Sequence, residues 1–281
     1  MPKPTATDQP ADASPASLDD DDTRPPGSVR ELYDGALWPD DNARTLRLSH
    51  HLFPTRTVRR GDRVHELPSR AQGLPPIAYG PPEQRRDLVD YMALHRVSGL
   101  VVLKDGALAF EQQALGYDAT SLWASMSMVK SISTTLVGAA IHQGLIGGVD
   151  DPVCHYLPEL RGSAYDGVSL RQLLQMASGV RWNETYTDPA SDRRRMLDAQ
   201  VAQQPGAILR LMASLPRAAP PGTVWNYSGG ETQVVGALVR AAVGMPLAEY
   251  LSERIWSRAG MEAEAHWWLE SPDGLEIGGS G

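Results

Sequence analysis

Ser127 and Lys130 lie three positions apart in the stretch SMSMVKSIS, residues 125–133. On a helix this spacing places two side chains next to each other on one face. A serine beside a lysine can work as a nucleophile with an adjacent base, because lysine, unlike arginine, can give up its proton. Only three of the 26 basic residues are lysines, the others being Lys3 and Lys104. The pattern predicts a nucleophilic serine with Lys130 as its base.

The alternative interpretation is that Ser127 caps a helix and Lys130 extends into solvent, as most such residues do. The neighbours Met128, Val129 and Ile132 are apolar. Apolar surroundings and the positive end of a helix dipole both favour a neutral amine. These features support the catalytic interpretation.

Tyr227 is the candidate for a third catalytic group. The spacing S-x-x-K is the nucleophile motif of penicillin-binding proteins and β-lactamases, and a tyrosine or serine is expected well downstream of it. In PPGTVWNYSGGETQVVGALV, Tyr227 follows a Pro-Pro-Gly turn and precedes a helix pattern, from where its phenol could reach Ser127 and Lys130. The alternative is a core tyrosine packed beside Trp225.

The elements that must position these residues predict an α+β fold. Two strands joined at Lys104-Asp105-Gly106 are indicated by an Asp-Gly pair between apolar runs. The helix after Ser127 is expected to continue for about five turns and to stop at Gly147-Gly148. Other helices are expected in the segments EQRRDLVDYMALHRV, SLRQLLQMA, SDRRRMLDAQVA, GAILRLMASL, ETQVVGALVRAAV and PLAEYLSERIW.

Three regions are predicted along the chain. Residues 1–28 are rich in Pro, Ala, Asp, Ser and Thr, and we expect a disordered tail there. Residues 29–84 are expected to form an irregular extension that wraps on the domain, because Pro and Gly interrupt their scattered apolar residues. Residues 85–281 are expected to form the catalytic domain.

Composition excludes several classes of function. A net charge of −8 and a pI near 5.4 argue against a nucleic-acid or anionic-membrane partner. The single Cys154 excludes an intrachain disulfide, and the seven histidines lack H-x-H or H-E-x-x-H spacing, so neither a metal nor a cofactor is expected. Without a signal-type N-terminus or about 18 consecutive apolar residues, a cytoplasmic location is expected. Small-molecule substrates are the expected partners, and a homodimer is left open.

The chain resembles the penicillin-recognising, β-lactamase-related serine hydrolases, and within them the 6-aminohexanoate-dimer (nylon-oligomer) hydrolases and related esterases. The resemblance rests on several blocks in the same order: SMSMVKS, LFPTRTVRRG, SGVRWNETYTDPASD, PPGTVWNYSGGETQVVG and GLEIGGSG. It implies an antiparallel sheet flanked by helices, with a mostly helical region. It further implies that Ser127 is acylated, that Lys130 accepts its proton and that Tyr227 protonates the leaving group.

The resemblance also implies that Tyr186, in NETYTDP, hydrogen-bonds the substrate amide; the alternative is a loop aromatic that covers the core. Penicillin-directed relatives have an asparagine two places after the catalytic tyrosine, whereas this chain has Gly229. This difference weakens a β-lactam interpretation. Hydrolysis of small linear amides is therefore predicted, with esters as the alternative substrates.

The backbone N–H of Ser127 is expected to form half of the oxyanion hole. No segment for the other half is found, so we expect the C-terminal strands of the fold to be missing and the 281-residue chain to be inactive. A catalytically silent relative that serves as a binding or structural domain is the alternative to an enzyme.

Overall fold

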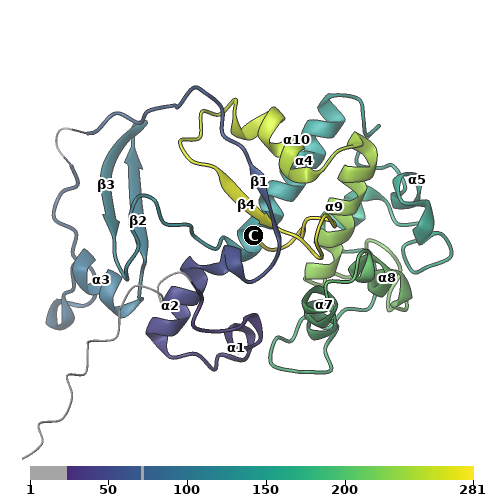
Figure 1. The fold of residues 1–281 in the computed structure, drawn as a ribbon, viewed down its shortest axis with the longest axis horizontal. Coiled ribbons are helices and arrows are strands. Elements are labelled where there is room, and N and C mark those ends of the chain that lie inside the picture. Colours follow the sequence, from purple (N-terminus) through teal and green to yellow (C-terminus); the bar gives the residue numbers. More distant parts are fainter. Residues whose placement is uncertain (1–23, 71–72) are drawn as a thin grey trace, which may run out of the picture.

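The computed structural model describes residues 24–70 and 73–281. Most of the expected tail, residues 1–23, lies outside this range. In Figure 1 most helices gather on one side of the molecule and a β-hairpin stands at the other, with a second small sheet and the N-terminal helices between them. The described chain is thus a mixed α+β structure, as predicted.

The predicted hairpin is confirmed. Strand β2 (Gly99–Lys104) pairs antiparallel with β3 (Ala107–Gln113), and a bulge lies between Val102 and Leu103. Asp105 and Gly106 form the two-residue turn, both with positive φ, of 56° and 75°. This is the conformation that Asp-Gly adopts most readily in a tight hairpin. Helix α3 (Leu88–Leu94) precedes the hairpin and begins with a capping box on Asp87.

A second sheet pairs two segments that are far apart in the sequence. Strand β1 (Thr55–Val58) runs antiparallel to β4 (Ala265–Trp268), with Thr55 opposite Trp268. Trp268 is buried and packs edge-on against Phe53, with ring centroids 5.3 Å apart. Part of the N-terminal extension is therefore joined to the last fifth of the chain.

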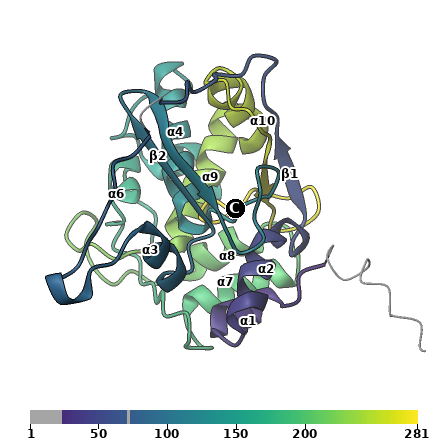
Figure 2. The ribbon, with the colours of Figure 1, turned by 90° about the vertical axis from the view of Figure 1, so that its left-hand side faces the viewer.

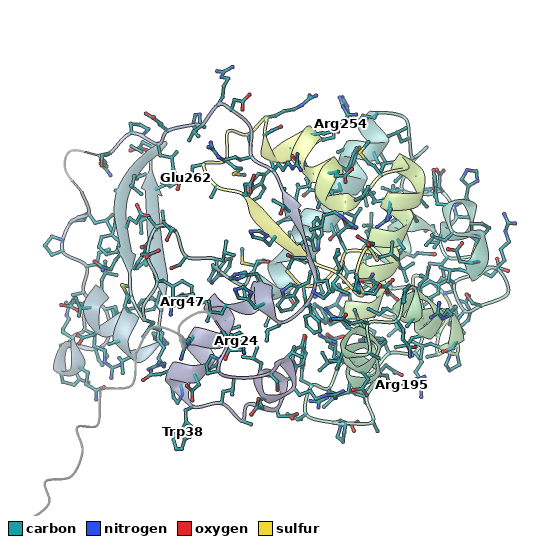
Figure 3. The ribbon with its side chains drawn as sticks, in the orientation of Figure 1. Arg24, Trp38, Arg47, Arg195, Arg254 and Glu262 are labelled. Carbon is teal, nitrogen blue, oxygen red and sulfur yellow. The ribbon has the colours of Figure 1, made fainter. Side chains whose placement is uncertain are left out.

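The segment 29–84 contains more regular structure than predicted. Helix α1 (Val29–Asp34) has a capping box formed by Ser28 and Glu31, and ends at Gly35 with φ 66°. Helix α2 (Pro39–Arg47) begins with proline at its first position, where the missing N–H costs nothing. In Figure 2, seen from the side of the hairpin, α1 and α2 lie at the lower end of the molecule. Trp38, just before α2, is 79% exposed and points away from the body (Figure 3).

The helical region forms the core. Helices α4 (Val129–His142) and α9 (Gly229–Val243) share one hydrophobic cluster through buried residues of both, Leu136, Val137, Ala140, Val234, Val235 and Leu238. The other helices are α5 (Val153–Tyr156), α6 (Leu170–Leu174), α7 (Asp192–Val201), α8 (Ala207–Ser214) and α10 (Leu247–Leu251), which continues into a π-helical turn over Ser252–Trp256. All the expected helical segments contain a helix.

The end predicted for the helix after Ser127 is wrong. Helix α4 ends at His142, and Gly144, with φ 71°, turns the chain before Gly147-Gly148 is reached. A left-handed residue just past a helix satisfies its last carbonyls, and here the N–H of Gly144 donates to the carbonyl of Ile141. Leu145 lies beyond the helix and is 42% exposed.

Candidate active site

Ser127 lies in a 3₁₀ turn (Met126–Met128) directly before α4. Its side chain makes no capping bond to either helical segment, so the capping interpretation does not hold. Met126 has φ 46°, which is unusual for a residue with a side chain. The N–H groups of Ser125 and Met126 donate to the carbonyl of Gly281 at 2.8 and 3.2 Å. These bonds hold the turn that presents the exposed Ser127.

Lys130 lies in the first turn of α4 and is half-buried. Its Nζ is 2.9 Å from Ser127 Oγ and 3.0 Å from the carbonyl oxygen of Gly279. The helical spacing thus brings the two side chains into hydrogen-bond contact, as predicted. The Gly279 carbonyl aligns the amine, because it accepts a second N–H of the same group.

Tyr227 completes a triangle with these two residues. Its hydroxyl lies 3.1 Å from Ser127 Oγ, and Lys130 Nζ lies 5.3 Å from the centre of its ring. The preceding residue, Asn226, is fixed by its N–H to the carbonyl of Met176. Trp225 is 70% exposed, so the alternative of a core tyrosine packed beside it is not supported. The structure therefore brings together Ser127, Lys130 and Tyr227.

Tyr186 and Ser127 both line one pocket. The pocket has a volume of about 420 Å³ and is lined by Leu32, Tyr33, Asn42, Leu46, Met126, Ser127, Tyr186 and Ser280. Tyr186 has no hydrogen bond to Ser127 among the described contacts; its hydroxyl donates to Glu184 Oε1 at 3.1 Å. Burial, and then the Glu184 carboxylate, raise the pKa of Tyr186 to about 12. Its phenol stays neutral at any pH at which the protein would work.

Glu184 lies where an asparagine at position 229 would extend. Its carboxylate accepts the indole N–H of Trp182 and the backbone N–H of Gly229, the latter at 2.9 Å. A Cβ added at Gly229 would lie 3.2 Å from Glu184 Oε1. A larger side chain at this position would have to displace the carboxylate. The glycine and the glutamate are thus packed as a pair.

The C-terminal segment 278–281 packs between α4 and α9, close to the triangle. Ser133 Oγ donates to the carbonyl of Gly278 at 2.7 Å, and the N–H of Gly278 donates to Gln233 Oε1 at 2.8 Å. A Cβ at Gly278 would lie 2.1 Å from the carbonyl oxygen of Thr232, so glycine is required for the close approach. Nothing in the sequence of this segment indicates the contact of Gly279 with Lys130.

Other kinds of site find no support in the described part of the chain. No group of three or more His, Cys, Asp or Glu side chains there could hold a metal ion. The rings of the consecutive residues His50 and His51 have centroids 3.9 Å apart. His266, distant in the sequence, lies 6.0 Å from His50. No single described helix has the length and apolarity to span a membrane; α9 with Leu247–Trp256 does so only as a pair bent by 74°.

Comparison with known proteins shows similarity to hydrolases. A 6-aminohexanoate-dimer hydrolase of Paenarthrobacter ureafaciens is 31% identical over 170 residues, which are 59% of this chain and 43% of that protein. Esterase EstB of Burkholderia gladioli is 30% identical over 148 residues, 50% of this chain and 37% of the esterase. The chain therefore spans less than half the length of these curated relatives.

Among solved structures, a Bacillus anthracis protein assigned as a 6-aminohexanoate-dimer hydrolase superposes with a TM-score of 0.77 at 22% identity. The match covers 89% of this chain and 67% of that one, and it shows a shared fold. The model of the beta-lactamase family matches residues 85–274, a range that contains Ser127, Lys130, Tyr186 and Tyr227. The chain belongs to the beta-lactamase family.

Proposed function

We propose that the protein is a serine hydrolase that cleaves small linear amides through an ester formed on Ser127. The observation that carries the proposal is the triangle of Ser127, Lys130 and Tyr227, with Nζ at 2.9 Å and the phenol at 3.1 Å from the same Oγ. A nucleophile in contact with a base and with a proton donor is the arrangement that acyl transfer requires. The pocket beside Ser127 is large enough for a slender chain.

In the first half-reaction, neutral Lys130 takes the proton from Ser127 as Oγ bonds to the carbonyl carbon of the substrate. The carbonyl oxygen becomes an oxyanion, for which the backbone N–H of Ser127 is the proposed donor. When the carbon–nitrogen bond breaks, the amine leaves with a proton from Tyr227, and the Lys130 ammonium returns a proton to the phenol. Each group thus regains its charge, and the acyl group remains on Ser127.

In the second half-reaction, water replaces the amine. Lys130 is again the proposed base: it takes a proton from the water that attacks the ester carbonyl, and Ser127 leaves as a hydroxyl that regains this proton. The Gly279 carbonyl, 3.0 Å from Nζ, keeps the amine directed at Ser127 in both steps. The chain therefore needs no group beyond these side chains to move protons.

Esters are the alternative substrates, because an activated alkoxide or phenolate leaves without a proton from Tyr227. The similarity to an esterase is in keeping with this alternative. β-Lactams are disfavoured in this proposal, because Gly229 offers no side-chain amide and Glu184 occupies the adjoining space. A silent relative used for binding is the remaining alternative.

A fluorophosphonate probe, which labels active serines, tests the proposal on the whole chain. Although the sequence alone predicts an inactive chain, the contacts of Lys130 and Tyr227 with Ser127 lead us to expect labelling at Ser127. We also expect loss of labelling in Ser127→Ala and strong loss in Lys130→Arg. Ser131→Ala, an exposed serine one residue beyond Lys130, is the matched control and should be labelled like the wild type. Absence of labelling together with absence of turnover of p-nitrophenyl acetate and of the linear aminohexanoate dimer would favour the silent relative.

A further inference from the structure

Arg193 carries a buried charge without an acidic partner among the described residues. It lies in α7 and is only 5% exposed. Its neighbour Arg194 forms an ion pair with Asp34, but the one side-chain acceptor found for Arg193 is the hydroxyl oxygen of Tyr33, and its Nη1 has no hydrogen-bond partner. Buried charges are normally paired, because desolvation is costly. Among the described residues, no carboxylate therefore contacts the guanidinium of Arg193.

The guanidinium lies against the aromatic wall of the candidate active site. Arg193 Cζ is 4.5 Å from the ring centre of Tyr33 and 5.6 Å from that of Tyr186, and the two rings are 5.3 Å apart. Both tyrosines line the pocket that contains Ser127, and no charged side chain is among its lining residues. The positive charge of Arg193 thus lies directly behind Tyr33, whereas the negative charge of Glu184 lies behind Tyr186.

Hydrogen bonding fixes what each tyrosine offers to a ligand. Tyr33 accepts an N–H from Arg193, so its own proton is free to be donated into the pocket. Tyr186 donates its proton to Glu184, so its oxygen can only accept from a ligand. Glu184 is the acidic group nearest to this pair in the hydrogen-bond network, and three donors already engage it: the indole of Trp182, the N–H of Gly229 and Tyr186. Tyr33 is therefore the donor of the pair.

We propose that Tyr33, with Arg193 behind it, binds a carboxylate at the far end of the linear substrate, an inference that rests on the proposed function. The phenol donates a hydrogen bond to the carboxylate, and the guanidinium supplies the opposite charge across the ring and its hydroxyl. Tyr33 is the specificity-determining residue in this account. Arg193 is a positioning residue, since it acts through Tyr33.

The test compares two ligands that differ only in charge at one end: the linear dimer of 6-aminohexanoate and its terminal carboxamide. The Ser127→Ala variant, which binds without turnover, is titrated calorimetrically with each. We expect the carboxylate to bind about tenfold more tightly than the carboxamide, the difference between a charge-assisted and a neutral hydrogen bond. Adding Tyr33→Phe, which keeps the ring against Arg193, should remove this preference. Adding Tyr91→Phe, an exposed tyrosine on α3, should leave it intact.

The same comparison in the active enzyme should place the preference in KM rather than in kcat, because the carboxylate lies away from the reacting carbonyl. Arg193→Met should lose the preference as Tyr33→Phe does; should this variant fail to fold, Tyr33→Phe alone decides. Equal binding of the two ligands, or an equal weakening of both by Tyr33→Phe, would overturn the inference. Tight carboxylate binding without any labelling of Ser127 would uphold it while rejecting the proposed function.

Discussion

Replacing Glu231 with glutamine should remove a pH-dependent loss of stability. Glu231 lies in the first turn of α9 and is 4% exposed. Its Oε1 accepts the hydroxyl of Ser178, whereas Oε2 is buried without a hydrogen-bond partner among the described residues. Burial raises the pKa of Glu231 to about 7, and the Ser178 hydroxyl only partly opposes this. The folded protein therefore holds this proton more tightly than the unfolded chain does.

The direction and the size of this change in stability follow from the coupling of proton binding to folding. Because the folded pKa of Glu231 lies above the unfolded value of 4.5, its contribution to stability is complete below about pH 4.5 and is lost as the pH rises through about 7. With these two pKa values, the free energy of unfolding should fall by about 2 kcal/mol between pH 5.5 and 8.5 on account of this group. A glutamine has no proton to lose and should show no such fall.

Urea unfolding of the wild type and of Glu231→Gln at pH 5.5 and 8.5 measures this difference directly. Other titrating groups contribute equally to both proteins and cancel in the comparison. Glu249 is an exposed glutamate on α10, and Glu249→Gln is the matched control. Its free energy of unfolding should fall between pH 5.5 and 8.5 by the same amount as that of the wild type. A difference between wild type and Glu231→Gln that changes by less than about 0.5 kcal/mol over this range would refute the reasoning.

Further predictions concern the site and its supports. Gly278→Ala should destabilise the fold by about 2 kcal/mol or more in urea unfolding, because the added Cβ would meet the Thr232 carbonyl. Gly138→Ala, in the middle of α4 where a Cβ meets no other atom, should stabilise the fold by up to about 1 kcal/mol. Equal effects of the two substitutions would contradict the packing described for Gly278. Burial and the charges of neighbouring histidines lower the pKa of His50. Its contribution to stability should therefore be complete above about pH 6.5 and be lost as the pH falls below that value. In melting curves recorded between pH 7 and 5, His50→Asn should reduce this loss of stability. Tyr227→Phe should slow amide cleavage more than cleavage of p-nitrophenyl acetate, and equal losses would show that its proton is not used.

The residues that could be predicted from the sequence are those whose geometry is local. The three-residue spacing of Ser127 and Lys130 fixes their contact once a helix forms, and Asp105-Gly106 fixes the hairpin turn. The contact of Tyr227 with Ser127, across 100 residues, could be predicted only because a known motif supplied it.

Contacts without such a motif could not be predicted. The approach of Gly279 to Lys130 depends on how two helices pack, and glycine has no side chain to signal it. Tyr33 lies in a segment that Pro and Gly interrupt, and its partner Arg193 lies 160 residues away, so no local spacing indicates their contact. The end of α4 predicted at Gly147-Gly148 is wrong for a local reason. A single glycine, Gly144, is enough to stop the helix before that pair is reached.

The contact between α4 and the segment 278–281 has a consequence for the order in which the protein can mature on the ribosome. The carbonyls of Gly278 and Gly279 hold Ser133 and Lys130, residues that are synthesised about 150 positions earlier. At a translation rate of about 5–20 residues per second, roughly 7 to 30 seconds pass after the synthesis of α4 before these partners exist. During that interval Lys130 lacks the carbonyl that directs its amine. A nascent chain would thus carry the serine and the lysine long before it could use them, and acylation of a half-made protein would be avoided.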